Sequence, residues 1–121
     1  MNPIKIVVFA FILGGTSIFT QCKKEEVDLL DCAGVTPTYT ANVKTILDNN
    51  CATAGCHSAS SRRAGYDLSS YAASVTSGGN QAFLGSIQHI SGYDPMPDGG
   101  AKLPEADVKT LSCWVQNGMP Q

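Results

Sequence analysis

The apolar positions divide the chain into an apolar start, a polar stretch and a series of short helical segments. Residues 6–13 are continuously apolar, whereas residues 23–36 carry mixed charges and show no sustained period. Beyond residue 36, apolar side chains recur three times at the spacing that gives a helix one apolar face. These faces comprise Tyr39, Val43, Ile46 and Leu47; Phe83, Ile87 and Ile90; and Val108, Leu111, Trp114 and Val115.

Local signals at the helix ends support these segments. Thr38 or Thr40 can cap the first helix, which leads directly into Cys51. A further short helix with a serine cap is expected at residues 69–73. Pro104 suits the first helical position of the last segment, where acidic residues favour the positive end of the helix dipole.

Long irregular connections separate the predicted helices. Residues 91–100 contain two prolines and three glycines, which exclude a regular helix or strand. No stretch of the chain shows the alternation that is typical of strands. The sequence therefore predicts an all-α domain of three to four short helices, whose long loops are suited to wrapping a cofactor.

The N-terminal residues have the pattern of an export signal. Lys5 precedes the apolar run 6–13, small residues follow, and the next charge is at Lys23. The run is shorter than the ~20 residues that a membrane-spanning helix needs. We therefore expect a signal peptide at residues 1–21.

Cys22, the next residue, resembles the acylated cysteine of bacterial lipoproteins. Thr20 and Gln21 depart from the small residues that usually precede such a cysteine, and an ordinary secreted protein with a spare cysteine is the alternative. With acylation, we expect a protein of the bacterial cell envelope, lipid-anchored to the membrane and facing the periplasm or the cell surface. The chain then divides into the signal peptide at 1–21, a lipidated N-terminus and tether at 22–36, and a domain at 37–121.

Cys51, Cys56 and His57 form the most informative cluster in the sequence. Two thiols followed at once by an imidazole are the pattern of covalent haem c attachment, in which two thioethers hold the porphyrin and the next residue binds the iron. Four residues separate the cysteines instead of the usual two, and Gly55 permits the sharp turn that the longer loop requires. A local disulfide or half of a zinc site is the alternative.

The five cysteines then divide into three roles. Cys22 is assigned to lipid, and Cys51 and Cys56 are assigned to haem. Cys32 and Cys113 remain, and we expect them to form a disulfide in an oxidising compartment. On a helical wheel Cys113 falls opposite the apolar face, so it is expected to face outward, where the passing N-terminal segment could reach it. The disulfide would then tie the tether to the last helix; two buried free thiols are the alternative.

Charge gives no indication of a nucleic-acid partner. The formal charge is −2, and the only basic pairs are Lys23-Lys24 and Arg62-Arg63. The second pair is better explained as solvated loop charge than as a partner of haem propionates.

Five short motifs follow one another in the second part of the chain, at residues 51–57, 65–68, 96–100, 103–108 and 114–118. Their order over residues 36–119 resembles a small class I cytochrome c domain, in particular the lipoprotein type of Bacteroidetes and Planctomycetes. The resemblance implies a cytochrome c-like fold around one covalent haem c. It also implies that His57 is the proximal iron ligand, that Met96 is the distal one, and that the terminal helices cross near the haem edge.

Met96 is favoured over His89 and Met119 as the sixth ligand. Pro95 and Pro97 restrict its backbone, which lowers the conformational freedom that a weak thioether ligand must lose on binding. His89 falls off the apolar face of its helix and is expected to contact solvent or a propionate. Met119 lies beyond the last helix and is better explained as an end cap.

The implied function is one-electron transfer with redox protein partners rather than enzymatic catalysis. Iron bound on both axial sides has no free position for a substrate, and His/Met ligation raises its reduction potential. If Met96 is a labile ligand, the alternative is a haem c protein that acts as a small-molecule sensor or a peroxidase. A third interpretation is a haem-free lipoprotein whose Cys51, Cys56 and His57 form a disulfide or a zinc site.

Overall fold

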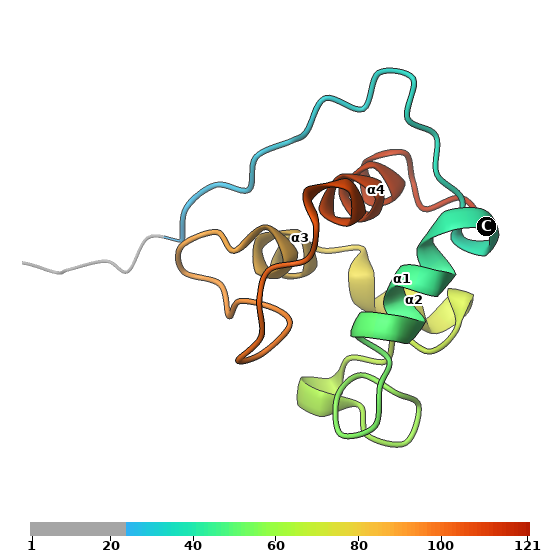
Figure 1. Ribbon diagram of the computed structural model, residues 1–121, viewed down its shortest axis with the longest axis vertical. Helices are drawn as coiled ribbons and strands as arrows, with labels where there is room; N and C mark the ends of the chain where they lie inside the picture. Colours follow the sequence, from blue (N-terminus) through green and yellow to red (C-terminus); the bar gives the residue numbers. More distant parts are fainter. Residues whose placement is uncertain (1–23) are drawn as a thin grey trace, which may run out of the picture.

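The computed structural model describes residues 24–121, which form helices and loops and contain no strand (Figure 1). The expected all-α class is therefore confirmed. The expected signal peptide at 1–21 and Cys22 lie outside the described residues, and no helix within 24–121 is long and apolar enough to cross a bilayer. The elements are η1 (Tyr39–Val43), α1 (Lys44–Asn50), η2 (Arg63–Gly65), α2 (Tyr71–Gly78), α3 (Gln81–Gln88) and α4 (Glu105–Gln116).

The first helical segment begins and packs as the sequence predicts. Thr38 caps it, since its hydroxyl oxygen accepts a hydrogen bond from the backbone N–H of Ala41. The side chains of Tyr39, Val43 and Leu47 are buried on one face. The sequence did not indicate that the first turn, η1, is a π-helix that continues into α1.

The two middle helices are short because the chain provides a cap at each start and a break at each end. Ser70 caps α2 and Asn80 caps α3, each through a side-chain oxygen that accepts a backbone N–H three residues on. The helix expected at residues 69–73 thus begins slightly later and extends to Gly78. His89 adopts the left-handed conformation and ends α3, so Ile90 lies beyond the helix on which it was expected.

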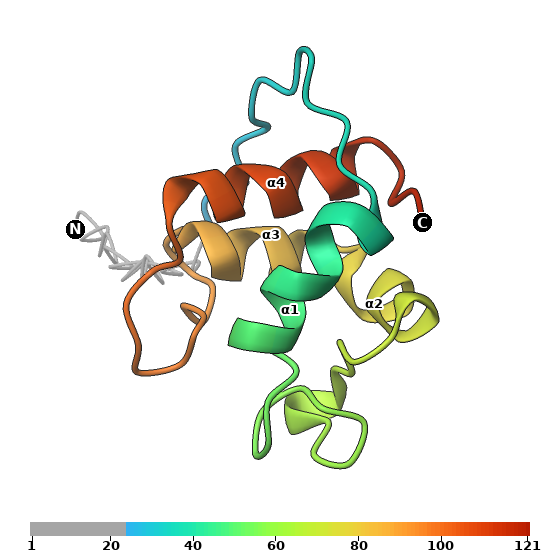
Figure 2. The ribbon, with the colours of Figure 1, turned by 45° about the vertical axis from the view of Figure 1, so that its right-hand side comes forward.

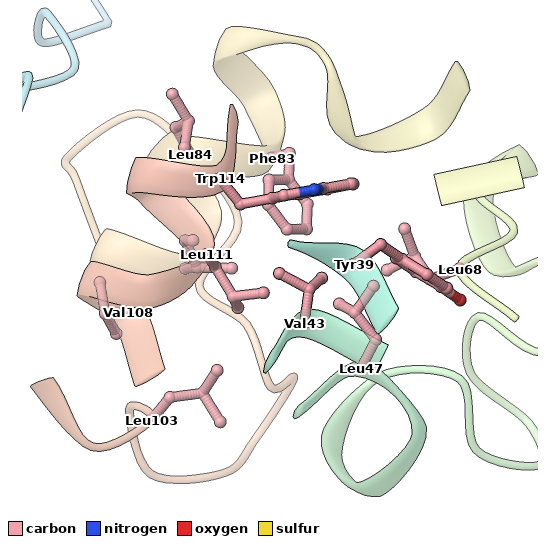
Figure 3. Packing of buried hydrophobic residues seen from close by; sticks show 11 residues of the cluster. Tyr39, Val43, Leu47, Leu68, Phe83, Leu84, Leu103, Val108, Leu111 and Trp114 are labelled. Carbon is pink, nitrogen blue, oxygen red and sulfur yellow. The ribbon is translucent and has the colours of Figure 1, made fainter. Parts of the chain in front are cut away.

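The last helix begins one residue later than predicted. Pro104 has extended rather than helical backbone angles, and it precedes α4 instead of occupying its first turn. The predicted inner face is otherwise correct, since Val108, Leu111 and Trp114 are buried. Figure 2 shows α4 lying along α3 with η1 packed beside it. In Figure 3, the side chains of Val43 and Leu111 meet within the core.

The C-terminal residues close over this core. The backbone carbonyl of Pro120 accepts hydrogen bonds from the backbone N–H of Tyr39 and from the indole N–H of Trp114, both at 2.9 Å. The rings of Tyr39 and Trp114 themselves lie 6.1 Å apart, centroid to centroid. The first and last helical segments are therefore joined through the end of the chain.

The segment expected to be a tether is instead held against the domain. Figure 1 shows it passing over α4, in blue to cyan. Its backbone carbonyl at Asp28 accepts a hydrogen bond from the Gln88 side chain at 3.4 Å, and its carbonyl at Val35 accepts one from Asn117 at 3.0 Å. The residues from Lys24 to Thr36 thus follow the surface of the domain rather than leading away from it.

A disulfide between Cys32 and Cys113 fixes this segment to α4. The two Sγ atoms are 2.05 Å apart and the Cα atoms 5.5 Å apart, which is the pairing that the sequence favours. Cys113 lies off the apolar face of α4, where the N-terminal segment reaches it as expected, and there its side chain is fully buried. The N-terminal segment covers that side of α4, and there the hydroxyl of Ser112 accepts a hydrogen bond from Gln88.

Replacing Cys32 and Cys113 together with alanine is expected to lower the free energy of unfolding by about 4–5 kcal/mol. The bond closes a long loop, with a sequence separation of 81 residues, and therefore restricts the unfolded chain strongly on the chain-entropy model. Denaturant unfolding of both proteins measures the difference. Two reactive thiols at these positions in denatured, unreduced protein would contradict the pairing.

Candidate cofactor site

Three of the four residues expected to hold a cofactor line one cavity. Its volume is about 290 Å³, near the lower end of the ~300–1,000 Å³ that is typical of ligand sites. Cys51 and His57 come from the loop that follows α1, and Met96 comes from the loop that follows α3. The buried side chains of Leu68, Phe83 and Ile87 form apolar parts of the wall.

The other candidates lie elsewhere. Cys56 is half-buried and is not part of the cavity wall, although its thiol is free. His89 and Met119, the competing ligands for an iron, do not line the cavity either. The structure therefore brings together Cys51, His57 and Met96 and separates them from both competitors.

Backbone hydrogen bonds shape the loop that carries the two free thiols. The N–H of Cys51 continues the pattern of α1 by donating to the carbonyl of Leu47 at 2.8 Å. The N–H of His57 donates back to the carbonyl of Cys51 at 3.0 Å, so the four residues between the cysteines bulge outward as a closed turn. Gly55 has a φ of +79° within this turn, as its position in the sequence suggested.

The His57 ring is held in one tautomer. Its Nδ1 lies 3.3 Å from the backbone carbonyl of Tyr66, and since a carbonyl can only accept, Nδ1 carries the proton. In the neutral ring Nε2 is then left with its lone pair, which is the arrangement found in metal-binding histidines. The backbone of His57 is fixed as well, because its carbonyl accepts a 2.8 Å hydrogen bond from Leu68.

Both backbone polar groups of Met96 are hydrogen-bonded to other parts of the chain. Its N–H donates to the carbonyl of Ser86 at 3.0 Å, and its carbonyl accepts a hydrogen bond from Nε2 of His89 at 2.9 Å. The expectation that His89 contacts solvent or a propionate is therefore wrong for this ring nitrogen. The left-handed backbone of His89 at the end of α3 directs the ring toward the Met96 loop, which a helical wheel could not show.

The environment of Cys51 keeps its thiol protonated. Burial, together with the neighbouring Cys56, raises the pKa of this thiol from 9.0 to about 11. Within residues 24–121, no group of three or more His, Cys, Asp or Glu side chains is arranged to hold a metal ion.

The two arginines after the attachment loop pair with carboxylates. Nε of Arg62 lies 3.4 Å from Asp67, and a terminal nitrogen of Arg63 lies 2.7 Å from Asp98. Both arginine side chains are more than half exposed, as expected for solvated loop charges. The Arg63–Asp98 pair nevertheless connects the segment that follows His57 in the sequence with the loop that carries Met96.

Comparison with known proteins does not assign the chain to a family. No family model, no curated protein and no solved structure matches the chain.

Proposed function

We propose that this protein is a one-electron carrier with a single covalent haem c, folded as a cytochrome c-like domain. The observation that carries the proposal is the convergence of Cys51, His57 and Met96 on one largely apolar cavity. Cys51 and His57 share one loop, and Met96 comes from a loop 39 residues after His57. A thiol and an imidazole can form a nucleophile–base pair, but a thioether has no role in one. They do form the donor set of a covalently attached haem with His/Met ligation.

Each residue then has a separate task. Cys51 and Cys56 would hold the porphyrin through thioether bonds, with Cys56 approaching from outside the present cavity wall. His57 would bind the iron through Nε2, since Nδ1–H is committed to the Tyr66 carbonyl. Met96 would be the second protein ligand of the iron, and Leu68, Phe83 and Ile87 would exclude water from the ring. When bound, the haem supplies an iron that changes by one electron between its ferric and ferrous forms.

The geometry favours an electron carrier over an enzyme. Both nitrogen and carbonyl of Met96 are hydrogen-bonded, so its side chain is presented by a fixed backbone. With His57 and Met96 as its ligands, a bound iron would have no free position for a peroxide or a gas. The sensor or peroxidase alternative requires that this loop detach.

A haem spectrum tests the proposal. The mature protein, produced in cells that attach haem c, should give the alkaline pyridine spectrum of a covalently bound haem, which acid and organic solvent do not extract. The reduced protein should not change its spectrum when carbon monoxide is added. Absence of covalent haem would refute the proposal, whereas an immediate change with carbon monoxide would favour the sensor or peroxidase alternative.

We extend the proposal to an envelope location in which Cys22 carries the lipid anchor. Cys22→Ser, produced with a signal peptide for soluble secretion, is expected to move the protein from the membrane fraction to the soluble fraction. Partition of the variant and of the unchanged chain is measured after cell fractionation. Equal membrane association of both proteins would contradict acylation at Cys22.

His89 is expected to act as a positioning residue for Met96. His89→Ala removes the hydrogen bond to the Met96 carbonyl, which is worth about 1 kcal/mol and corresponds to a roughly fivefold larger population with Met96 detached. The weak long-wavelength absorption band of Met-ligated ferric haem should lose intensity, and carbon monoxide should shift the spectrum of the reduced variant although it leaves that of the unchanged protein as it is.

The matched control is His89→Gln, which keeps an N–H donor near the position of Nε2. Both variants place a non-glycine residue in the same left-handed backbone, so the strain at this position is similar in the two proteins. The glutamine variant should retain the absorption band. If the two variants behave alike, the hydrogen bond does not position Met96.

A further inference from the structure

The N-terminal end of the described chain lies at the rim of the candidate haem cavity. Lys24 is one of the residues that line it. Its Nζ lies 4.8 Å from the centroid of the Tyr93 ring, which also lines the cavity, in a cation–π contact. The backbone N–H of the next residue, Glu25, donates to the carbonyl of Ser91 at 3.2 Å.

Gly92 makes this close approach of two backbones feasible. A Cβ atom at this position would lie 2.9 Å from the Cα of Lys24, closer than real side-chain atoms come. The φ of Gly92 is +88°, which residues with side chains rarely adopt. The position of Lys24 is thus set by the same loop that carries Met96.

The residues after Lys24 are fixed to the domain, so they cannot extend to increase the distance between Lys24 and the domain. They are held by the hydrogen bond at Asp28 and by the disulfide at Cys32. Only Lys23 separates Lys24 from Cys22, and two residue steps of extended chain span at most about 7 Å.

We infer that the lipid anchor holds the rim of the haem cavity against the membrane surface, and that the electron-transfer partner is a membrane-bound redox protein with its redox centre near the headgroups. This inference rests on the proposed haem and on the proposed acylation of Cys22. One electron passes between the partner and the haem iron, so that one is oxidised as the other is reduced, and no bond or proton is exchanged.

Distances and charge both favour this orientation over the opposite one. A domain of about 100 residues has a radius of gyration of about 13 Å, so turning the cavity away from the bilayer would require a tether well over 7 Å. Lys23 and Lys24 would lie among the headgroups, where each basic side chain near anionic lipid is attracted to the surface. A soluble partner of protein size would have to displace the bilayer to reach the rim.

The test compares two carriers of the same oxidant. The acylated, haem-containing protein is bound to vesicles of phosphatidylethanolamine and phosphatidylglycerol and reduced. Ferrocenium is then offered either on an acyl chain within the bilayer or attached to a soluble globular protein, and each ferrocenium takes one electron from the ferrous haem. The rate of haem oxidation is recorded with each carrier, and for the soluble carrier also with the Cys22→Ser protein free in solution.

We expect the soluble carrier to oxidise the vesicle-bound protein at least about tenfold more slowly than it oxidises the free Cys22→Ser protein. Encounters between proteins depend on access to one surface patch, here the rim of the cavity. The lipid-borne carrier should remain fast. Inserting about 20 Gly/Ser residues between Lys23 and Lys24, with a mean span of about 25 Å, should restore the soluble reaction. The same insertion placed after Gln121 is the matched control and should restore nothing.

Equal rates of the soluble carrier with the vesicle-bound and the free protein would overturn the inference, as would an insertion before Lys24 that changes nothing. Absence of haem from the spectrum, or of acyl chains from the mass of the chain, would overturn it together with the proposal concerned. The haem spectrum and the mass of the chain are recorded before any rate is measured, so a missing haem or a missing acyl chain is not mistaken for a wrong orientation.

Discussion

Replacing both Cys51 and Cys56 with alanine is expected to yield a chain without covalent haem and without a stable fold. The walls formed by Leu68, Phe83 and Ile87 would then surround an empty space. This cavity of about 290 Å³ is open to solvent, so water would enter it and meet apolar walls that the haem would otherwise cover, at about 25 cal/mol per Å². A typical domain is stabilised by only about 5–15 kcal/mol, so the loss of this burial removes a large part of its stability.

The measurement combines haem content with the circular dichroism and urea sensitivity of the purified double variant. The matched control is the pair Cys32→Ala and Cys113→Ala, which also removes two sulfurs and should keep its haem despite lower stability. A double variant at Cys51 and Cys56 that is well folded and free of haem would show that the core does not depend on the cofactor.

Met96→Ala is expected to lower the reduction potential and to open the iron to carbon monoxide. The thioether stabilises ferrous over ferric iron, so its loss should lower the potential by on the order of a hundred millivolts, within the ~0.8 V range that axial ligands span. Redox titration measures the shift, and the spectrum of the reduced protein with carbon monoxide detects the open position.

Met119→Ala provides the comparison, because it removes the same type of side chain from a position outside the cavity. It should leave both the potential and the response to carbon monoxide unchanged. If His89→Ala lowered the potential and Met96→Ala did not, the iron would have two histidine ligands and the Met96 loop would be structural only.

The sequence was sufficient where the structure depends on local spacing. The inner faces of the first and last helices follow from apolar periodicity, and the Thr38 cap follows from side-chain chemistry. The pairing of Cys32 with Cys113 followed from the roles assigned to the other cysteines. That Cys51, His57 and Met96 share a cavity agrees with the residues chosen from sequence motifs, although the cofactor itself is a proposal.

The sequence was insufficient where contacts between distant segments decide the outcome. Cys113 lies off the apolar face of α4 and is nevertheless buried, because a polar segment with no periodic pattern covers it. His89 points toward Met96 because its backbone leaves the helix, and a wheel assumes that the helix continues. The disulfide that ties residues 24–36 to α4 was expected, but nothing in their composition indicated the hydrogen bonds to their backbone that also hold them in place.

The closure of the C-terminus has a practical consequence for handling the protein. The Pro120 carbonyl serves two donors at once, the backbone N–H of Tyr39 and the indole of Trp114. A carboxypeptidase that removes the last two residues would leave both donors without a partner, at about 1–3 kcal/mol for each that is buried. Extending the chain beyond Gln121 leaves the carbonyl in place. An affinity tag is therefore compatible with this end of the molecule, whereas trimming back to a shorter terminus is not.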